Sequence, residues 1–250
     1  MKVKVSLVSY LNTLPFLYGI NQTKFSNGID LQLDIPSVCA QKLVDNDVDL
    51  GLVPIAVLPQ LKEYHIISDY CIGAKGKVNS VLLLSDVPLN EIEEVYLDYQ
   101  SKTSINLTRI LAKKVWNINP KWKNAKKGYE NKISGKIAGV IIGDRTFNLN
   151  KEYKYKYDLS EEWYKFTGLP FAFACWVSNK ELSTSFTDEL NKALSVGVMH
   201  INEAITDLHP GQIPAKKLLN YLTHDIDYHL DDNKRKSIKL FLEYLSEITD

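Results

Sequence analysis

Small polar side chains stand at the ends of several apolar runs in this sequence, where strand-like patterning gives way to helix-like patterning. In open α/β sheets, ligands bind outside the carboxyl ends of the strands, so these junctions are where we expect chemistry. Asparagine, serine and threonine offer neutral hydrogen-bonding groups, and a following helix adds unpaired backbone N–H groups that suit an anion. The junctions span residues 10–13, 53–55, 100–104 and 143–145, and residues 79–80 precede a further strand.

The junction at residues 100–104 is the most informative of these. Ser101, Thr103 and Ser104 place three hydroxyl groups at the expected start of a helix. The positive end of the helix dipole and the small donors together predict a site for a carboxylate or a phosphate. The alternative interpretation is that one of these residues is an ordinary N-cap, since most helices begin in this way.

The other junctions allow similar pairs of interpretations. Asn12 is either a ligand-binding amide or the N-cap of an ordinary turn. Asp144 is either a general base or a cap for the next turn, and Arg145 either pairs with a carboxylate or lies in solvent. Ser80 stands alone before a strand, so its residue type gives little guidance.

Several common chemistries have no matching pattern. We find no phosphate-binding glycine loop, no dinucleotide fingerprint and no nucleophile elbow. The segment THDIDYH at residues 223–229 holds two histidines and two aspartates, but no cysteine or glutamate completes a metal set, and we expect it to be exposed surface between helices. None of the histidines lies at a junction: His65, His200, His209, His224 and His229. We therefore expect no metal and no nucleotide cofactor.

The composition is that of an ordinary globular protein. The 250 residues carry 30 basic and 30 acidic side chains, so the net charge is zero and a nucleic-acid partner is not expected. The basic segment at residues 119–132 is interpreted as a solvated loop and helix face. The three cysteines are far apart in the sequence, which favours reduced thiols and a cytoplasmic protein. No apolar leader precedes the first strand, and no apolar run is long enough to span a membrane, so we expect no membrane partner.

Alternation of strand-like and helix-like segments predicts an α/β fold with largely parallel sheets. We expect strands in residues 3–10, 30–35, 48–58, 64–85 (two runs), 94–100, 136–147 and 168–180, and a helical C-terminal part. A helix after residue 36 is expected to have Ser37 as its N-cap. The pattern suggests two lobes, one of residues 1–88 and 174–250 and the other of residues 89–173, with the ligand in the cleft between them.

The sequence also resembles a known family. The blocks VSYLNTLPFLYG, DIPSVCAQKLVDNDVDLGLVPIAVLP, IISDYCIGAKGKVNSVLLLS, VYLDYQSKTSINLTRIL and EEWYKFTGLPFAFACWV are similar to the chorismate dehydratases of the futalosine route to menaquinone. The resemblance runs from about residue 3 to residue 200, and SYLNTLPF and LDYQSKTS are its most specific pieces.

The resemblance implies a two-lobed fold like that of type II periplasmic binding proteins, used here for catalysis. It implies a cofactor-independent lyase that removes water from chorismate and leaves 3-[(1-carboxyvinyl)oxy]benzoate. It places Asn12 at the reacting centre, and Ser80 beside a substrate carboxylate or the departing hydroxyl. The remaining residues that it implies for substrate binding are Tyr10, Thr13, Pro54, Ser101, Thr103, Ser104, Gly143, Asp144 and Phe171. The base is either Asp144 or the enolpyruvyl carboxylate of the substrate.

Three alternatives stay open at this point. A non-catalytic solute-binding protein for a small carboxylate would have the same fold, but it would need a secretion leader or a lipidated cysteine. The naphthoate-forming synthase of the same pathway is expected to depend on a histidine in its cleft, and no histidine is expected there. An effector-binding part of a transcription regulator would need a DNA-binding segment before the first strand.

Overall fold

The computed structural model describes residues 2–209, 211 and 213–249. The chain forms two compact units, each built around its own sheet. Unit 1 comprises Met1–Gly73 and Ala172–Asp232, and unit 2 comprises Ala74–Phe171 and Asn233–Asp250. The α/β class and the division of the chain into two parts agree with the expectation from the sequence.

Unit 1 holds a six-stranded sheet in the order β11-β4-β10-β3-β1-β2. Strands β1, β2 and β3 are parallel, whereas β10 is antiparallel to β3 and β11 is antiparallel to β4. The sheet is therefore mixed, and the expectation of largely parallel sheets was wrong. The strands are β1 (Val3–Val8), β2 (Ile29–Asp34), β3 (Leu50–Pro54), β4 (His65–Ala74), β10 (Phe171–Ser178) and β11 (Asp227–His229).

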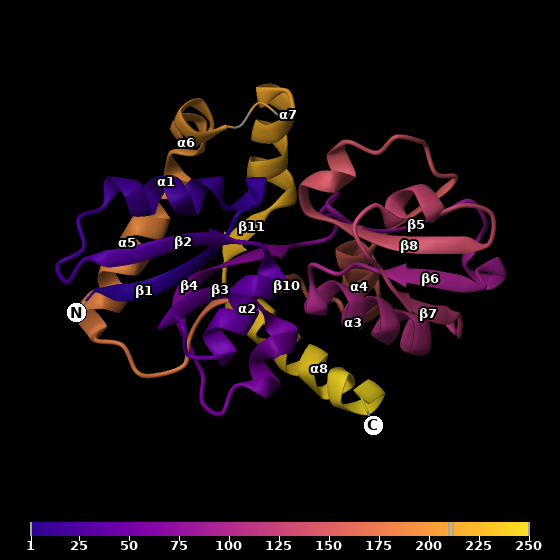
Figure 1. Ribbon diagram of the computed structural model, residues 1–250, viewed down its shortest axis with the longest axis horizontal. Helices are drawn as coiled ribbons and strands as arrows, with labels where there is room; N and C mark the ends of the chain where they lie inside the picture. The colour runs from indigo at the N-terminus through magenta and orange to yellow at the C-terminus, as the bar shows by residue number, and fades with distance from the viewer. Residues whose placement is uncertain (1, 210, 212, 250) are drawn as a thin grey trace. The chain divides into compact units, whose positions relative to one another are not determined.

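The first two helices of unit 1 lie on opposite faces of this sheet. Helix α1 (Leu14–Gln22) connects β1 to β2 on one side, and α2 (Pro36–Val44) leads back past β1 to β3. Because strand–helix–strand crossovers are right-handed, connections that run in opposite directions place their helices on opposite faces. Figure 1 shows α1 above the sheet and α2 below it.

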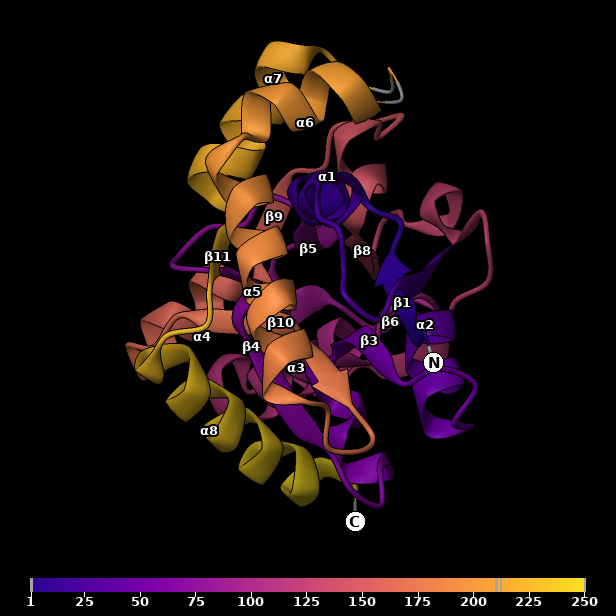
Figure 2. The ribbon, with the colours of Figure 1, turned by 90° about the vertical axis from the view of Figure 1, so that its left-hand side faces the viewer.

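Two glycines allow α1 to pack closely against α5 (Thr184–Met199). A Cβ atom on Gly19 would lie 1.9 Å from the carbonyl oxygen of Ala193, and one on Gly197 would lie 1.7 Å from that of Pro15. Figure 2 shows the two helices side by side, with α6 (Ile201–Leu208) and α7 (Ala215–Asn220) near them. This packing fixes the helix that begins directly after the first junction.

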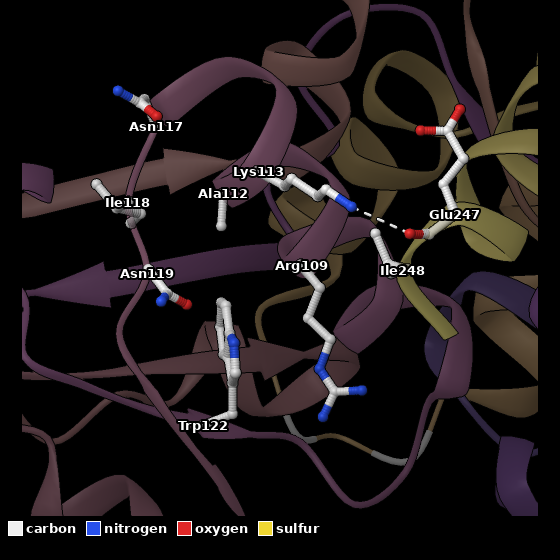
Figure 3. A pocket seen from close by; sticks show the side chains of 9 residues that line it. All are labelled: Arg109, Ala112, Lys113, Asn117, Ile118, Asn119, Trp122, Glu247 and Ile248. Atoms are coloured by element: carbon white, nitrogen blue, oxygen red, sulfur yellow. Dashed lines mark hydrogen bonds between the residues drawn. The ribbon is translucent and has the colours of Figure 1, made fainter. Parts of the chain in front are cut away.

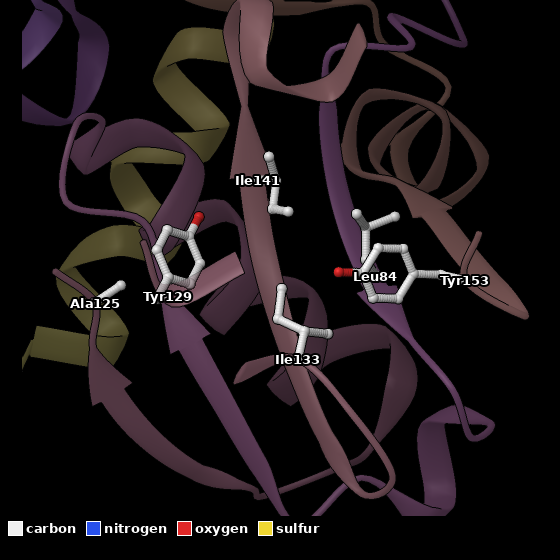
Figure 4. Packing of buried hydrophobic residues seen from close by; sticks show 6 residues of the cluster. All are labelled: Leu84, Ala125, Tyr129, Ile133, Ile141 and Tyr153. Atoms are coloured by element: carbon white, nitrogen blue, oxygen red, sulfur yellow. The ribbon is translucent and has the colours of Figure 1, made fainter. Parts of the chain in front are cut away.

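Unit 2 holds a five-stranded sheet in the order β7-β6-β8-β5-β9. Strand β6 is parallel to β7 and β8, and β5 is antiparallel to β8 and β9. Buried side chains that include Tyr129, Ile133 and Ile141 pack on this sheet (Figure 4). The elements are β5 (Val81–Ser85), β6 (Glu94–Leu97), α3 (Lys102–Leu111), β7 (Lys121–Asn124), β8 (Ile137–Ile142), β9 (Tyr155–Asp158), α4 (Leu159–Thr167) and α8 (Asp232–Thr249).

The boundaries of the units differ from those expected. Strand β5 belongs to unit 2 because its backbone pairs with β8 and β9. Most of α8 belongs there as well, since the ring of Phe241 packs against Trp163 and Phe171 at centroid distances of 6.3 and 5.5 Å. The indole N–H of Trp163 also donates a hydrogen bond to the Ser237 hydroxyl at 2.9 Å.

Three local expectations also differ from the structure. Helix α2 has Ile35 as its N-cap and Pro36 in its first turn, so Ser37 lies inside the helix. Part of the basic segment forms the edge strand β7 rather than only loop and helix. The segment 223–229 contributes β11, in which Tyr228 is buried, so it is not merely exposed surface. In the part of the chain that the structure describes, no helix has the length and apolarity needed to cross a membrane.

Candidate functional site

The topology of unit 1 singles out the carboxyl ends of β1 and β3. These strands are parallel neighbours, with Val5 opposite Leu50 and Ser6 opposite Gly51. The chain leaves β1 toward β2 on one side, and it leaves β3 toward β4 on the other. Ligands of open α/β sheets bind where neighbouring connections diverge in this way. Of the predicted residues, Asn12 lies just after β1, and Pro54 is the last residue of β3.

Asn12 lies in a 3-10 turn, Leu11–Thr13, between β1 and α1. The Thr13 hydroxyl donates hydrogen bonds to the carbonyls of Val8, at 2.5 Å, and Tyr10, at 2.7 Å, and so closes the turn on itself. Asn12 is 9% exposed, and its Oδ1 is buried with no hydrogen-bond partner among the described residues. A buried, unpaired amide oxygen is costly, so a donor from a ligand fits this position.

Tyr228 fixes the turn from the far end of the chain, which the sequence patterns do not reveal. Its hydroxyl donates a hydrogen bond to the backbone carbonyl of Asn12 at 2.9 Å. Its ring packs edge-on against Phe16 of α1, with a centroid distance of 5.2 Å. The backbone of Asn12 is therefore held while its side-chain oxygen stays available.

The topology of unit 2 repeats the arrangement at the carboxyl ends of β6 and β8. These parallel neighbours connect in opposite directions, β6 to β7 and β8 to β9. Of the predicted residues, Gly143 directly follows β8, and Ser101 lies four residues after the end of β6, at the start of α3. Because β5 is antiparallel to β8, Ser80 comes to the same edge, and its carbonyl accepts a hydrogen bond from the Gly143 amide at 2.8 Å. Three of the predicted junctions thus meet at one edge of this sheet.

The hydroxyl residues of the third junction form the first turn of α3. The Ser101 hydroxyl accepts a hydrogen bond from the Ser104 amide at 3.3 Å, so Ser101 is the N-cap. The Ser104 hydroxyl donates to the same Ser101 oxygen at 3.1 Å, and Thr103 is fully buried. The capping interpretation is confirmed for Ser101, and binding of an anion at this turn stays a prediction.

Arg145 joins the third and fourth junctions. Its guanidinium donates to the buried carboxylate of Asp98, to Glu130 at 2.8 Å and to the Gln100 side chain at 3.1 Å. Arg145 therefore pairs with carboxylates of the protein itself rather than lying in solvent, and pairing of Arg145 with a ligand carboxylate stays a prediction. Asp98 also accepts from the Gln100 amide and from the Tyr129 hydroxyl, both at 2.8 Å. Burial raises the pKa of Asp98, and the charge of Arg145 opposes that rise.

Asp158 holds the loop that carries Ser80. Its carboxylate accepts the backbone N–H groups of Val78 and Asn79 at 2.9 and 2.7 Å, and two more at the start of α4. Asn79 has a φ of 57°, a left-handed conformation that asparagine adopts more readily than most residues. Burial raises the pKa of the Asp158 carboxyl, although the four N–H groups favour its charged form.

The other predicted residues are placed as follows. Tyr10 and Asp144 are half-buried, and Pro54 is buried at the end of β3. Phe171 is fully buried, and its ring packs against Trp163 at 5.3 Å in the core of unit 2. Asp98, Tyr129, Asp158 and Tyr228 are the supporting residues that sequence reasoning missed. Among residues 2–209, 211 and 213–249, no three metal-ligating side chains lie close enough to share an ion.

A family model described as menaquinone biosynthesis matches residues 3–247. The chain belongs to this menaquinone biosynthesis family. Its place in that biosynthesis agrees with the resemblance in the sequence blocks, and the matched range extends past residue 200 to cover the helical C-terminal part.

Similarities to known proteins support this assignment. The chain is 24% identical to a chorismate dehydratase of Thermus thermophilus over 232 residues, which is 84% of each chain. The crystal structure of protein AF1704 from Archaeoglobus fulgidus is similar, with a TM-score of 0.74, 12% identity, and 99% and 98% of the two chains covered. The Candida albicans CA3427 gene product, which has the generic periplasmic binding protein fold, gives a TM-score of 0.65 at 11% identity, covering 100% and 92%. The expected periplasmic-binding-protein-like fold is confirmed.

Proposed function

We propose that this member of the menaquinone biosynthesis family is a cytoplasmic chorismate dehydratase. The proposed reaction removes water from chorismate and yields 3-[(1-carboxyvinyl)oxy]benzoate. The observation that carries the proposal is the buried Oδ1 of Asn12, which has no hydrogen-bond partner in the described part of the chain and lies at the carboxyl end of β1, inside the family-like block SYLNT. The similarity to the Thermus thermophilus enzyme supports the choice of substrate.

The chemistry needs little from the protein besides positioning and charge stabilisation. The ring carboxylate of chorismate is conjugated through a double bond to the carbon that loses its proton, so the anion formed is delocalised. The C–O bond to the ring hydroxyl then breaks, the hydroxide leaves as water with the proton that the base has taken up, and the ring becomes aromatic, which drives the reaction forward. Neutral donors and a helix start suffice to hold two carboxylates and to stabilise the developing charge. The proposed reaction is therefore cofactor-independent.

We assign a role to the predicted residues of each unit, taken unit by unit. In unit 1, Asn12 hydrogen-bonds the substrate beside the reacting carbon, with its Oδ1 accepting a substrate hydroxyl. In unit 2, the first turn of α3, with Thr103 and Ser104, binds one substrate carboxylate through its N–H groups. Ser80 orients the other carboxylate or the departing hydroxyl. Tyr10 and Pro54 contribute apolar surface beside Asn12.

The base in this proposal is the enolpyruvyl carboxylate of the substrate. It is tethered to the ring, so its effective concentration at the neighbouring proton is high. Asp144 is the alternative base. An Asp144→Asn variant separates the two, because it keeps turnover if the substrate supplies the base and loses roughly 100-fold or more if Asp144 does.

Product analysis tests the proposed reaction. Chorismate labelled with ¹³C in its enolpyruvyl group is incubated with the protein and followed by chromatography, ultraviolet absorption and mass. We expect an aromatic product that is lighter by one water and retains the label. Release of labelled pyruvate would contradict the assignment, as would chorismate that decays only at its spontaneous rate. The second result, together with measured binding of a carboxylate, would favour a solute-binding protein.

A further inference from the structure

A cavity of about 520 Å³ lies in unit 2, at the other end of α3 from the candidate site. Helix α3 starts at the carboxyl end of β6, and a π-helical turn, Ala112–Trp116, brings the chain back toward the start of the parallel strand β7. The cavity is lined by the last part of α3, by this turn and the loop after it, by Trp122 of β7 and by the end of α8. Its volume is in the range of small-molecule sites, which is roughly 300–1,000 Å³.

Arg109 brings a positive charge to this cavity. Its Nε is buried and has no hydrogen-bond partner among the described residues. Its guanidinium lies over the ring of Trp122, 5.9 Å from the centroid, and no carboxylate of the described residues pairs with it. Buried polar atoms are almost always hydrogen-bonded, so this group is poised for an acceptor from outside the chain.

Lys113 adds a second positive charge. Its Nζ donates to the backbone carbonyl of Glu247 at 3.0 Å, as Figure 3 shows, whereas the Glu247 carboxylate pairs with Lys114. The acidic side chain at the rim is thus already neutralised by a different lysine. The cavity as a whole favours an anion.

The remaining wall selects for a flat apolar group. The face of Trp122 and the side chains of Ala112, Ile118 and Ile248 line the space beside the guanidinium. Asn119 points toward the same space and adds a neutral hydrogen-bonding amide. Aromatic rings stack well on tryptophan, and a guanidinium presents a planar fork that matches a carboxylate.

We propose that this cavity is a second binding site, which takes a small aromatic carboxylate. Arg109 binds the carboxylate, with Lys113 contributing to the positive field, and Trp122 stacks on the ring. The site is separate from the strand-end residues proposed for chorismate, so it does not depend on that function.

Titration with trans-cinnamate, followed by the indole N–H signals in ¹H–¹⁵N NMR spectra, tests the proposal. The chain has four tryptophans, and a Trp122→Phe variant identifies the reporter signal. We expect a saturable shift of the Trp122 signal with cinnamate and none with the neutral cinnamamide. Arg109→Gln should weaken binding at least tenfold, Arg109→Lys should weaken it less, and Asn12→Ala should leave it unchanged.

Several results would overturn the proposal. An unmoved Trp122 signal up to roughly 10 mM cinnamate would mean that no useful site exists there. Equal shifts with cinnamate and cinnamamide would remove the role of Arg109. Loss of binding in Asn12→Ala with full binding in Arg109→Gln would place the ligand at the candidate active site instead. Thermal unfolding of each variant establishes that it is folded. If Arg109→Gln does not fold, the comparison of wild type with Arg109→Lys still tests the role of Arg109.

Discussion

The hydroxyl of Tyr228 donates a hydrogen bond to the backbone carbonyl of Asn12 across 216 residues of sequence. Both residues are buried in unit 1, and the side-chain oxygen of Asn12 is left without a partner among the described residues. Tyr228 therefore supports the turn that presents Asn12 without occupying its side chain.

Replacing Tyr228 with Phe should reduce turnover of chorismate roughly threefold to tenfold, because the Asn12 turn loses its fixed position. The unpaired carbonyl should also cost about 1 kcal/mol of unfolding free energy. Steady-state kinetics and urea unfolding measure the two effects. Tyr70→Phe is the matched control, since Tyr70 also packs edge-on against Phe16, at 6.3 Å, and donates no hydrogen bond to Asn12. Equal turnover in the two variants would contradict a positioning role for Tyr228.

Substitution of two N-cap serines distinguishes helix capping from substrate binding at the first turn of α3 in unit 2. Ser101 and Ser183 are both N-caps that accept an amide hydrogen bond at 3.3 Å, from Ser104 and from Phe186. Replacing either with Ala should therefore cost about 1 kcal/mol of unfolding free energy. Only Ser101→Ala should raise KM for chorismate, by roughly tenfold, because only that turn is proposed to bind a carboxylate. If KM is unchanged in both, Ser101 is a cap and nothing more.

Removing the charge of Arg145 should make the free energy of unfolding depend more strongly on pH than it does in wild type. Burial raises the pKa of Asp98 above its ordinary value of 3.8, and Arg145 opposes that rise. In Arg145→Gln the folded-state pKa of Asp98 rises further, while that of the unfolded chain stays the same. At low pH Asp98 is protonated in both states, so the variant is close to wild type. As the pH rises from the folded-state pKa of Asp98 in wild type to its higher folded-state pKa in the variant, the variant loses stability relative to wild type.

At neutral pH this loss should reach about 3 kcal/mol, the scale for leaving a buried carboxylate without its partner. Urea unfolding of both proteins across the pH range measures it. Lys136→Gln is the control, because it breaks an ion pair with Glu93 in which both side chains are more than half exposed. That control should leave stability close to that of wild type at every pH, because the exposed pair is screened by solvent. A difference for Arg145→Gln that does not vary with pH would show that Asp98 is not the group responsible.

The strand–helix junctions could be predicted from the sequence because their signals are local. An apolar run such as residues 3–8 followed by Asn12 and a helix needs no distant information, and the topology then brought Ser80, Ser101 and Gly143 to one sheet edge. The short edge strands β7 and β11 were missed because they have few apolar residues, and their backbone pairing, not their side chains, makes them strands.

The supporting residues could not be predicted because their contacts join distant parts of the chain. Nothing in the pattern around Tyr228 indicates that its hydroxyl reaches Asn12. Asp98 and Arg145 are 47 residues apart, and each has an ordinary surface interpretation when taken alone. The unit boundaries depend on nonlocal packing for the same reason, as in the contact of Phe241 with Trp163.

The most direct test of the proposed site compares the turnover of chorismate by wild type, Asn12→Ala and Asn21→Ala. Asn21 is an exposed asparagine on α1, the helix that begins just after Asn12, and is the matched control. We predict that wild type and Asn21→Ala form the dehydrated product at equal rates. Asn12→Ala, shown by thermal unfolding to be still folded, should be slower by roughly 100-fold or more, the scale for losing a group that positions the reacting hydroxyl. Near-normal turnover in folded Asn12→Ala would contradict the account.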